Sequence, residues 1–184
     1  SVHYYYACYL PRGYGDGAEP YGWRKLKDGP ITDSETIVER DVLGDRIQMA
    51  FDLVSDVRKQ AEKGRICIFA GDLNQPSHLD WAEETKTHWG HNGAVVPWSV
   101  SSFLLSHGFH DAYRVVYPDP LKNPGFTWPV YNKDARKSTA WAPEADERDR
   151  IDFVYYYGDA RITVSKARLV GPGMTIEYGN PARD

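Results

Sequence analysis

The sequence predicts a single α/β domain in which strands alternate with helices and long loops gather along one edge of a sheet. Two observations lead to this prediction. The expected elements run in the order strand, loop, helix, strand, loop, helix, loop and hairpin. The chain has 184 residues, of which 41% are hydrophobic, so it can bury one sizeable core but not two.

The first part of the chain predicts a strand, a long loop and a long helix. Residues 2–10 (VHYYYACYL) are mostly β-forming, which favours a strand. Residues 11–30 carry five glycines and three prolines, a composition typical of a long functional loop. The spacing of Thr36 and Glu39 fits a capping box, and apolar residues then recur at helical period up to Gly64. This pattern predicts one long amphipathic helix packed on a sheet.

The middle of the chain predicts a buried strand and a short helix. Residues 65–70 (RICIFA) form a short continuous apolar run, which indicates a strand buried on both faces. A loop rich in histidine and tryptophan is expected over residues 77–98. Ser99 then caps a short helix that ends near Gly108.

The last part of the chain predicts another long loop and a hairpin. Residues 118–149 are rich in proline and charge and are expected to be a loop. Residues 151–157 and 161–170 read as two strands, and Gly158 and Asp159 between them suit a tight hairpin connection. Reactive side chains are expected on the long loops, because a rigid scaffold positions them there.

Composition narrows the range of functions. Lys and Arg number 22 against 26 Asp and Glu, a net charge of -4, which disfavours tight sequence-blind binding of nucleic acid. No run of 18 apolar residues occurs, so no transmembrane segment is predicted. Cys8 and Cys67 lie in apolar segments and are expected to be buried free thiols. The compartment stays undecided, and secretion is open if a signal peptide lies upstream.

The sharpest feature is the segment at residues 71–76 (GDLNQP), directly after an expected strand. Asp72 and Asn74 are two residues apart, so in an extended segment their side chains leave on the same side. The carboxylate can orient water or hold Mg2+, and the amide can donate to a phosphoryl oxygen. The same two residues also commonly build a turn at the end of a strand, so the pair alone leaves both readings open.

Four segments in order resemble the endonuclease/exonuclease/phosphatase family of DNase-like, metal-dependent phosphoesterases. GDLNQP is similar to the family's GDFNxP signature, and GFHDAYR, GFTWP and RIDFV follow in the family's order. The resemblance implies a four-layer α/β sandwich, of which residues 1–184 would be the C-terminal half to two-thirds. It also implies an enzyme that hydrolyses a phosphodiester or phosphomonoester with Mg2+ or Mn2+.

The resemblance implies catalytic roles for four residues. Asp72 matches the aspartate that orients the attacking water, and Asn74 matches the asparagine that binds phosphate. Both are also candidate metal ligands. Asp152 matches the aspartate that fixes the tautomer of the catalytic histidine. Tyr9 stands where many members have a histidine, and a tyrosine in this place resembles the AP-endonuclease branch, where it donates to the scissile phosphate. A core role for Tyr9 is the alternative.

Three further side chains are candidates for contact with substrate. Trp128 lies where the family places an aromatic residue near the substrate, and a packed wall is the alternative. His78 follows the signature closely and could touch substrate. Arg150 is expected mainly as a structural partner of Asp152. The Thr127 hydroxyl could donate to phosphate, but a bond to backbone is favoured.

Parts of the family site have no match in this sequence. The metal-binding glutamate of an earlier strand and the C-terminal Ser-Asp-His do not occur. The chain is therefore expected to be a partial domain that is nearly inactive without the remainder of its own domain. A small molecule, a lipid headgroup and nucleic acid all remain possible substrates. The alternative function is that of a catalytically silent relative acting as a binding or partner module.

Overall fold

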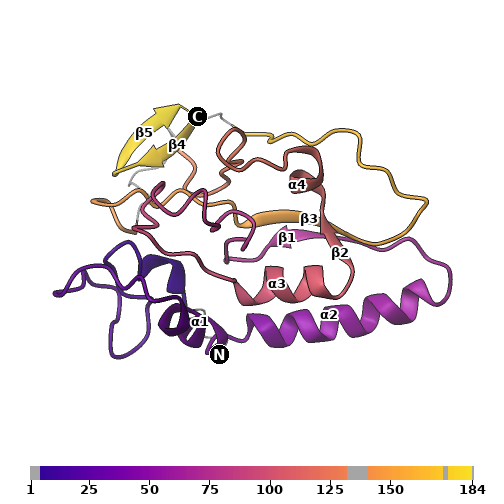
Figure 1. Cartoon of the computed structure of the whole chain (residues 1–184), viewed down its shortest axis with the longest axis horizontal. Helices are drawn as coiled ribbons and strands as arrows, with labels where there is room; N and C mark the ends of the chain where they lie inside the picture. Colours follow the sequence, from indigo (N-terminus) through magenta and orange to yellow (C-terminus); the bar gives the residue numbers. More distant parts are fainter. Residues whose placement is uncertain (1–4, 132–140, 172–173, 184) are drawn as a thin grey trace.

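The computed structural model describes residues 5–131, 141–171 and 174–183. Helices and strands are mixed along the chain, which confirms the predicted α/β class (Figure 1). The helical elements are η1 (Ala7–Tyr9), α1 (Ser34–Val42), α2 (Arg46–Ala61), α3 (Ser99–Ser106) and α4 (Ala112–Val116). The strands are β1 (Ile68–Asp72), β2 (Phe109–Asp111), β3 (Asp152–Tyr157), β4 (Met174–Glu177) and β5 (Asn180–Arg183). Among these residues no helix is long and apolar enough to cross a bilayer.

The main sheet has three antiparallel strands in the order β1-β3-β2. β3 is central because its residues pair with β1 along one edge and with β2 along the other. The β1 register runs from Ile68 opposite Tyr156 to Asp72 opposite Asp152. β4 and β5 form a separate two-stranded hairpin. The register therefore brings the two ends of the predicted site, GDLNQP and RIDFV, together.

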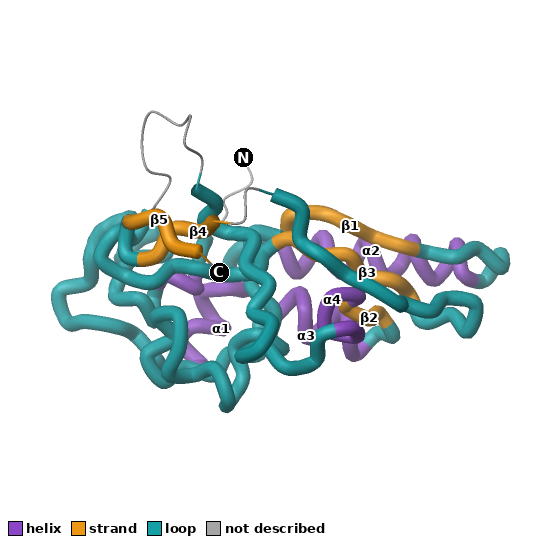
Figure 2. Tube along the Cα trace, turned by 90° about the horizontal axis from the view of Figure 1, so that it is seen from above, coloured by secondary structure: helices purple, strands orange, loops and turns teal. Residues whose placement is uncertain are grey.

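Helices α2 and α3 cover one face of the main sheet (Figures 1 and 2). Side chains alternate across a strand, so Phe153 and Tyr155 of β3 face these helices and are buried. They pack in one cluster with residues of α2, α3 and β2, namely Ala50, Val54, Val100, Leu104 and Phe109. We call α2, α3 and β1–β3 together the helix–sheet half.

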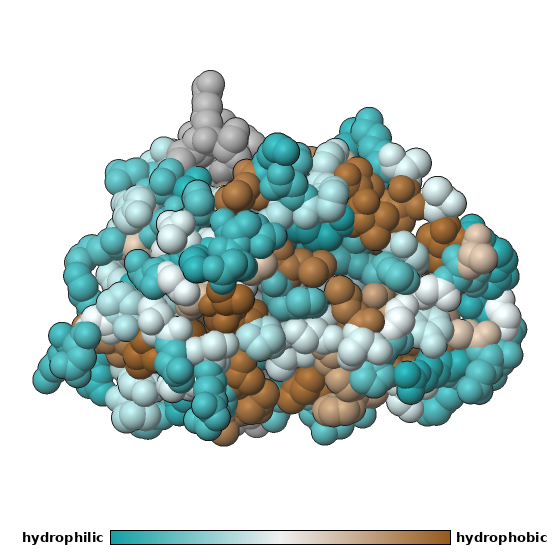
Figure 3. All heavy atoms as spheres, viewed as in Figure 1, coloured by the Kyte–Doolittle hydropathy of each residue, from teal (hydrophilic) through white to brown (hydrophobic). Residues whose placement is uncertain are grey.

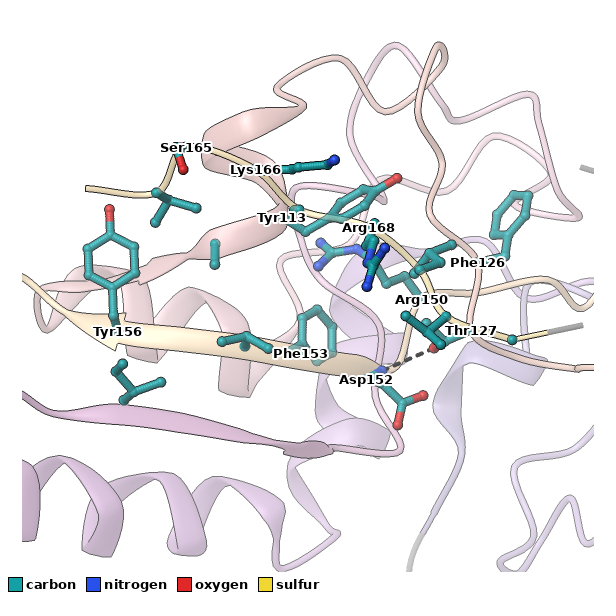
Figure 4. A pocket seen from close by; sticks show the side chains of 18 of the residues that line it. Tyr113, Phe126, Thr127, Arg150, Asp152, Phe153, Tyr156, Ser165, Lys166 and Arg168 are labelled. Carbon is teal, nitrogen blue, oxygen red and sulfur yellow. Dashed lines mark hydrogen bonds between the residues drawn. The ribbon is translucent and has the colours of Figure 1, made fainter. Parts of the chain in front are cut away.

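The opposite, outer face of the sheet is partly open. Ile68 of β1 and Val154 of β3 lie on it and remain exposed. Residues 162–171 run across this face as an extended strap (Figure 2). Strap and sheet together enclose a groove of about 910 Å³, seen from close by in Figure 4. Elsewhere, hydrophobic side chains occur in separate patches among hydrophilic ones (Figure 3).

The rest of the core is built largely from loops. We call residues 5–31, 74–98 and 141–150 the loop half. Its buried apolar residues form a second cluster together with Ile37 of α1: Ala7, Cys8, Tyr9, Leu10, Trp81, Ala94, Val96, Trp98, Ala142 and Ala145. Charged side chains are buried beside them. Arg12 pairs with Asp149 at 2.6 Å, and Asp80 pairs with both Arg114 and Arg150, at 2.6 and 2.8 Å.

The predicted first strand is wrong over its described part. Residues 7–9 form a turn of 3-10 helix, because the backbone N–H of Tyr9 bonds to Tyr6 and that of Leu10 to Ala7. The apolar character of this stretch reflects burial rather than strand pairing, since Leu10 is fully enclosed in the loop-half cluster.

The predicted single long helix is also wrong, because it is divided into α1 and α2 around Gly44. The backbone N–H of Gly44 closes a turn onto Asp41 instead of continuing the helix. The cap lies one turn earlier than predicted: the carboxylate of Asp33 accepts from the N–H of Thr36 at 2.8 Å.

Two further strand predictions need correction. The strand after α2 begins only at Ile68, and it is not buried on both faces, because the helices cover one face alone. Residues 161–170 form no strand. They cannot form a hairpin with β3, because β1 and β2 occupy both edges of that strand. The predicted short helix is confirmed, but Ser99 is its first residue rather than its cap, because the N-cap position is held by Trp98. Neither cysteine is in a disulfide, but Cys67 is only half-buried.

Candidate active site

The end of β1 sets the geometry of the predicted signature. Asp72 is the last residue of the strand, and its Oδ1 accepts from the backbone N–H of Asn74 at 2.7 Å. Asn74 has a φ of 48°, the left-handed conformation that asparagine tolerates better than most residues. The segment is thus a turn, as one reading of the sequence held, and this turn holds the Asp72 carboxylate in place.

The next residue, Gln75, ties this turn to two helices. Its Nε2 donates to Asp41 of α1 at 2.6 Å, and its Oε1 accepts from the backbone N–H of Val100 at 3.0 Å. The other carboxylate oxygen of Asp41 accepts from the N–H of Ser99. These bonds satisfy N–H groups at the start of α3 that the helix itself leaves unpaired. The signature loop is therefore fixed to the helix–sheet half.

Asp72 and Asp152 lie directly opposite each other on the outer face of the sheet. The next pair along the two strands, Leu73 and Ile151, is joined by a backbone hydrogen bond. The backbone N–H of Asp152 instead points away from β1 and donates to the hydroxyl of Thr127 at 3.1 Å (Figure 4). Asp72 and Asp152 are therefore a non-hydrogen-bonded pair, in which side chains approach most closely. The favoured expectation for Thr127, a hydroxyl bonded to backbone, is confirmed.

The surroundings of Asp72 shift the pKa of its carboxyl upward from the ordinary value. Partial burial is the largest cause and raises the pKa of this carboxyl. The N–H of Asn74 lowers the pKa, and the nearby charge of Asp152 raises it again. A carboxylate with a raised pKa is a better proton acceptor than an ordinary surface aspartate.

Four of the predicted site residues line one cavity of about 180 Å³. Asp72 and Asn74 reach it from the end of β1, Tyr9 from η1 and Trp128 from the loop after α4. The remaining described lining residues are Tyr6, Cys8, Trp23, Trp141, Asp149 and Ile151. Asp152 stands just outside this cavity, opposite Asp72. The structure thus brings together residues separated by more than a hundred positions along the chain.

Tyr9 is held by its neighbours in this cavity. Its hydroxyl donates to Glu147 Oε2 at 2.8 Å and accepts from Trp128 Nε1 at 3.2 Å. Burial raises the pKa of the phenol well above its usual range. Because the proton of Tyr9 is engaged by a carboxylate, it can reach a phosphate only if that bond is exchanged. Cys8 beside it is a buried thiol whose pKa is raised by burial to about 12, so it is no nucleophile near neutral pH.

Two predicted substrate contacts lie elsewhere. Ser101 Oγ lies 2.9 Å from the His78 ring Nδ1 and accepts from the His78 backbone N–H, so this histidine faces α3. Arg150 does not pair with Asp152 as expected. It is buried and forms ion pairs with Asp80 and Asp111, at 2.8 and 2.7 Å. Arg150 thus links the loop that carries Asp80 to Asp111 of β2. It also lines the groove on the outer face of the sheet.

The sequence reasoning missed several cavity residues. Trp23 lies in the predicted glycine- and proline-rich loop and Trp141 in the predicted loop rich in proline and charge, and their shared position appears only in three dimensions. Glu147 and Asp149 belong to the charged run at residues 146–150 and are buried, whereas a charged run usually lies on a solvated face. The available signal was the alternation of acidic and basic residues over 147–150, which suits mutual pairing in a buried segment.

The described residues fit a divalent cation in part. Asp72 and Asp152 offer carboxylate oxygens and Asn74 an amide oxygen, the hard donors that Mg2+ and Mn2+ prefer. Mutual repulsion between the two carboxylates is what a bound cation would relieve. Within the described ranges no third Asp, Glu, His or Cys joins them. Mg2+ commonly binds through one or two carboxylates and keeps several waters, so this donor set is sufficient to begin a site.

Comparison with known proteins agrees with the geometry. No solved structure matches the chain. Over 91 residues, half of the chain, it is 42% identical to Uncharacterized protein F14F9.5 of Caenorhabditis elegans, and this stretch is 28% of that protein. The chain thus spans well under two-thirds of that relative. The model of the Endonuclease/Exonuclease/phosphatase family matches residues 5–176, which include every predicted site residue. The chain therefore belongs to the Endonuclease/Exonuclease/phosphatase family.

Proposed function

We propose that this chain carries part of the active site of a metal-dependent phosphoesterase that hydrolyses a phosphodiester or phosphomonoester by attack of water. The observation that carries the proposal is the close pair of carboxylates, Asp72 and Asp152, on adjacent strands, with Asn74 beside them. Family membership supports a phosphoesterase or nuclease-like function in general.

Each residue has a definite task in this proposal. Asp72, whose pKa is raised, orients the attacking water and accepts its proton. Asn74 donates its side-chain amide to a phosphoryl oxygen. Asp152 holds a second carboxylate beside Asp72, where it can position a metal ligand or the family's histidine. Bound Mg2+ or Mn2+ would polarise the phosphoryl oxygen and lower the pKa of water.

Tyr9 and Trp128 shape the wall of the site. The chain of hydrogen bonds from Trp128 through Tyr9 to Glu147 fixes both rings. We assign Tyr9 a conditional role, as a donor to phosphate after its proton leaves Glu147. A further glutamate and histidine, contributed by polypeptide outside this chain, would complete the metal site and the opposite face of the phosphate.

The test is hydrolysis of bis(4-nitrophenyl) phosphate with Mg2+ or Mn2+, using this chain and the full polypeptide that contains it. We expect turnover by the full polypeptide and almost none by this chain alone. Asp72→Asn should lower kcat by about 100-fold or more, because it removes the proton acceptor and leaves the turn intact. Asp56→Asn, an exposed aspartate on α2, is the matched control and should be without effect.

The alternative function gives a different result. If the full polypeptide is folded and binds the metal in calorimetry, yet hydrolyses no ester in a panel that includes monoesters and alkyl diesters, the chain is a silent relative of the fold. Equal activity of Asp72→Asn and wild type would contradict the assignment of Asp72 directly.

A further inference from the structure

The site cavity is unusually rich in aromatic rings and poor in positive charge. Of its ten described lining residues five are aromatic, two are acidic and none is Lys or Arg. A phosphate-binding wall would normally offer cationic side chains. The cavity wall away from Asp72 and Asn74 is therefore suited to a part of the substrate other than the phosphate.

Three of the rings form a continuous series at one side of the cavity. The centroids of Tyr6 and Trp23 are 5.5 Å apart with planes inclined by 45°, and those of Trp23 and Trp141 are 5.2 Å apart at 37°. Successive inclined rings give a curved wall rather than a flat one. Trp23 is 49% exposed and Trp141 58% exposed, so both rings keep free surface although each has an aromatic neighbour.

The two exposed rings are held in place from several sides. Gly17 has a φ of +93°, and a Cβ there would lie 2.3 Å from Trp23 Cζ2, so the indole lies flat on bare backbone. The backbone N–H of Trp141 donates to Glu147 Oε2 at 3.0 Å. Lys25 and Glu144 form an ion pair between the two loops that carry these tryptophans. Positioned, exposed tryptophans indicate a binding surface more than a packing defect.

The charge around the rings favours a cation. Tyr9 donates its proton to the buried Glu147 carboxylate, which makes this phenol ring more electron-rich. Asp72 adds negative charge at the other end of the cavity. The nearby Arg12 is neutralised by Asp149 at 2.6 Å. The Arg46 guanidinium already lies over the Tyr6 ring, 5.1 Å from its centroid, so Trp23 and Trp141 are the rings that can take a further cation. Neither arginine is among the described lining residues.

We propose that Trp23 and Trp141, with Tyr6 packed behind Trp23, form a subsite for an organic cation, a quaternary ammonium or protonated amine carried by the alcohol part of the phosphoester. The substrate class would then be a zwitterionic phosphoester, with its phosphate at Asp72 and Asn74. Faces of electron-rich rings attract such cations within about 6 Å of the centroid. The position of the phosphate in this proposal rests on the proposed function. The position of the cation rests on the aromatic rings alone.

The subsite can be tested without any turnover. Choline and its uncharged isostere 3,3-dimethylbutan-1-ol are titrated into the protein by calorimetry, in EDTA. We expect choline to bind about tenfold more tightly than the isostere. Trp23→Leu should remove most of that preference, and Trp23→Phe should keep part of it, with circular dichroism confirming that both variants are folded. Phe51→Ala removes an aromatic ring of equal exposure, 49%, on α2 and should change nothing.

Three results would overturn the subsite: equal affinity for choline and the isostere, an unchanged preference in Trp23→Leu, or tighter binding of an uncharged planar probe such as adenosine. Hydrolysis then separates the two proposals. Choline binding without hydrolysis of any ester rejects the enzyme and keeps the subsite. If phosphoesters of choline and of 3,3-dimethylbutanol are hydrolysed with equal kcat/KM, and choline itself does not bind, the subsite is rejected and the enzyme is kept.

Discussion

The helix–sheet half and the loop half of this chain are stabilised in different ways. In the helix–sheet half, strands and helices satisfy their own backbone groups, and seven of the ten buried residues are apolar. In the loop half, an arginine side chain supplements the backbone hydrogen bonds of the loops. Arg12 donates to the backbone carbonyls of Cys8, Trp89, Asp146 and Arg148 as well as to the Asp149 carboxylate.

This difference explains why the candidate site lies between the two halves. The carboxylates that need exact spacing come from paired strands, where the register fixes their separation. The aromatic side chains that would select a substrate come from loops, where sequence can change without altering the sheet. Buried ion pairs such as Arg12–Asp149 hold these loops to one geometry.

If buried ion pairs hold the loop half together, breaking one should have the largest effect on stability. Arg12→Met leaves the Asp149 carboxylate buried without its partner, and four carbonyls lose a donor. We expect a loss of about 3–5 kcal/mol in the free energy of unfolding, measured by urea denaturation. A loss below about 1 kcal/mol would show that apolar packing alone supports the loops.

The helix–sheet half should respond instead to the loss of apolar volume. Leu104 of α3 is fully buried among residues of α2 and the sheet. Leu104→Ala should lower the free energy of unfolding by about 3 kcal/mol, because it leaves a cavity as well as removing apolar contact. Leu105→Ala, at a half-buried neighbouring position, is the control and should cost clearly less. Equal losses in the two variants would mean that α3 repacks.

A pH titration should sharpen the comparison, because the loop half buries a neutral histidine. His91 stacks on Trp81 with ring centroids 3.7 Å apart, and burial lowers its pKa to about 2. The unfolded chain takes up a proton near pH 6.5, so the stabilising effect of burial is complete above that pH and is lost as the pH falls toward 2. Between pH 7 and pH 5 we expect a loss of about 2 kcal/mol.

His91→Phe keeps an aromatic ring against Trp81 and removes the titrating group. Urea denaturation at pH 7 and pH 5 should therefore show a smaller pH dependence in this variant than in wild type. If both proteins lose the same stability, the pH dependence arises from other groups, such as His78, whose pKa is also lowered by burial.

The smallest effect is expected for an ion pair on the surface. Lys59 and Asp56 lie 3.3 Å apart on α2, and both side chains are largely exposed to water. Water and salt screen such a pair, so Lys59→Met should leave the midpoint of urea unfolding unchanged within error. A loss comparable to that of Arg12→Met would remove the distinction between buried and exposed pairs on which the comparison depends.

What could be predicted from the sequence follows the same division. The α/β class and the helix from Ser99 follow a simple hydrophobic period and are confirmed. The position of Asp72 at the end of a buried-type strand was also correct, although that strand is covered on one face only. Periodicity is a reliable guide where repeating backbone bonds decide the structure.

Periodicity fails where contacts between side chains distant in sequence decide the structure. The aromatic run before Leu10 looked like a strand, but in its described part Tyr9 is buried, and Tyr6 is half-buried, against loops far away in sequence. The charged run at residues 146–150 lies in a segment expected only to be a loop, yet most of it is buried, because its partners Arg12 and Asp80 are supplied by distant segments. No local pattern can show which distant charge will compensate a buried one.

If Asp72 and Asp152 act as proposed, their pairing across the sheet makes the activity of the protein a measure of correct folding. If β1 slipped by one residue against β3, Asp72 would turn toward the helices and an apolar neighbour would take its place on the outer face. Molecules trapped in that register would keep much of their helix and strand content and contribute nothing to phosphoester cleavage. Specific activity per mole of protein would then report the fraction of chains that reached the native register, a quantity that circular dichroism cannot resolve.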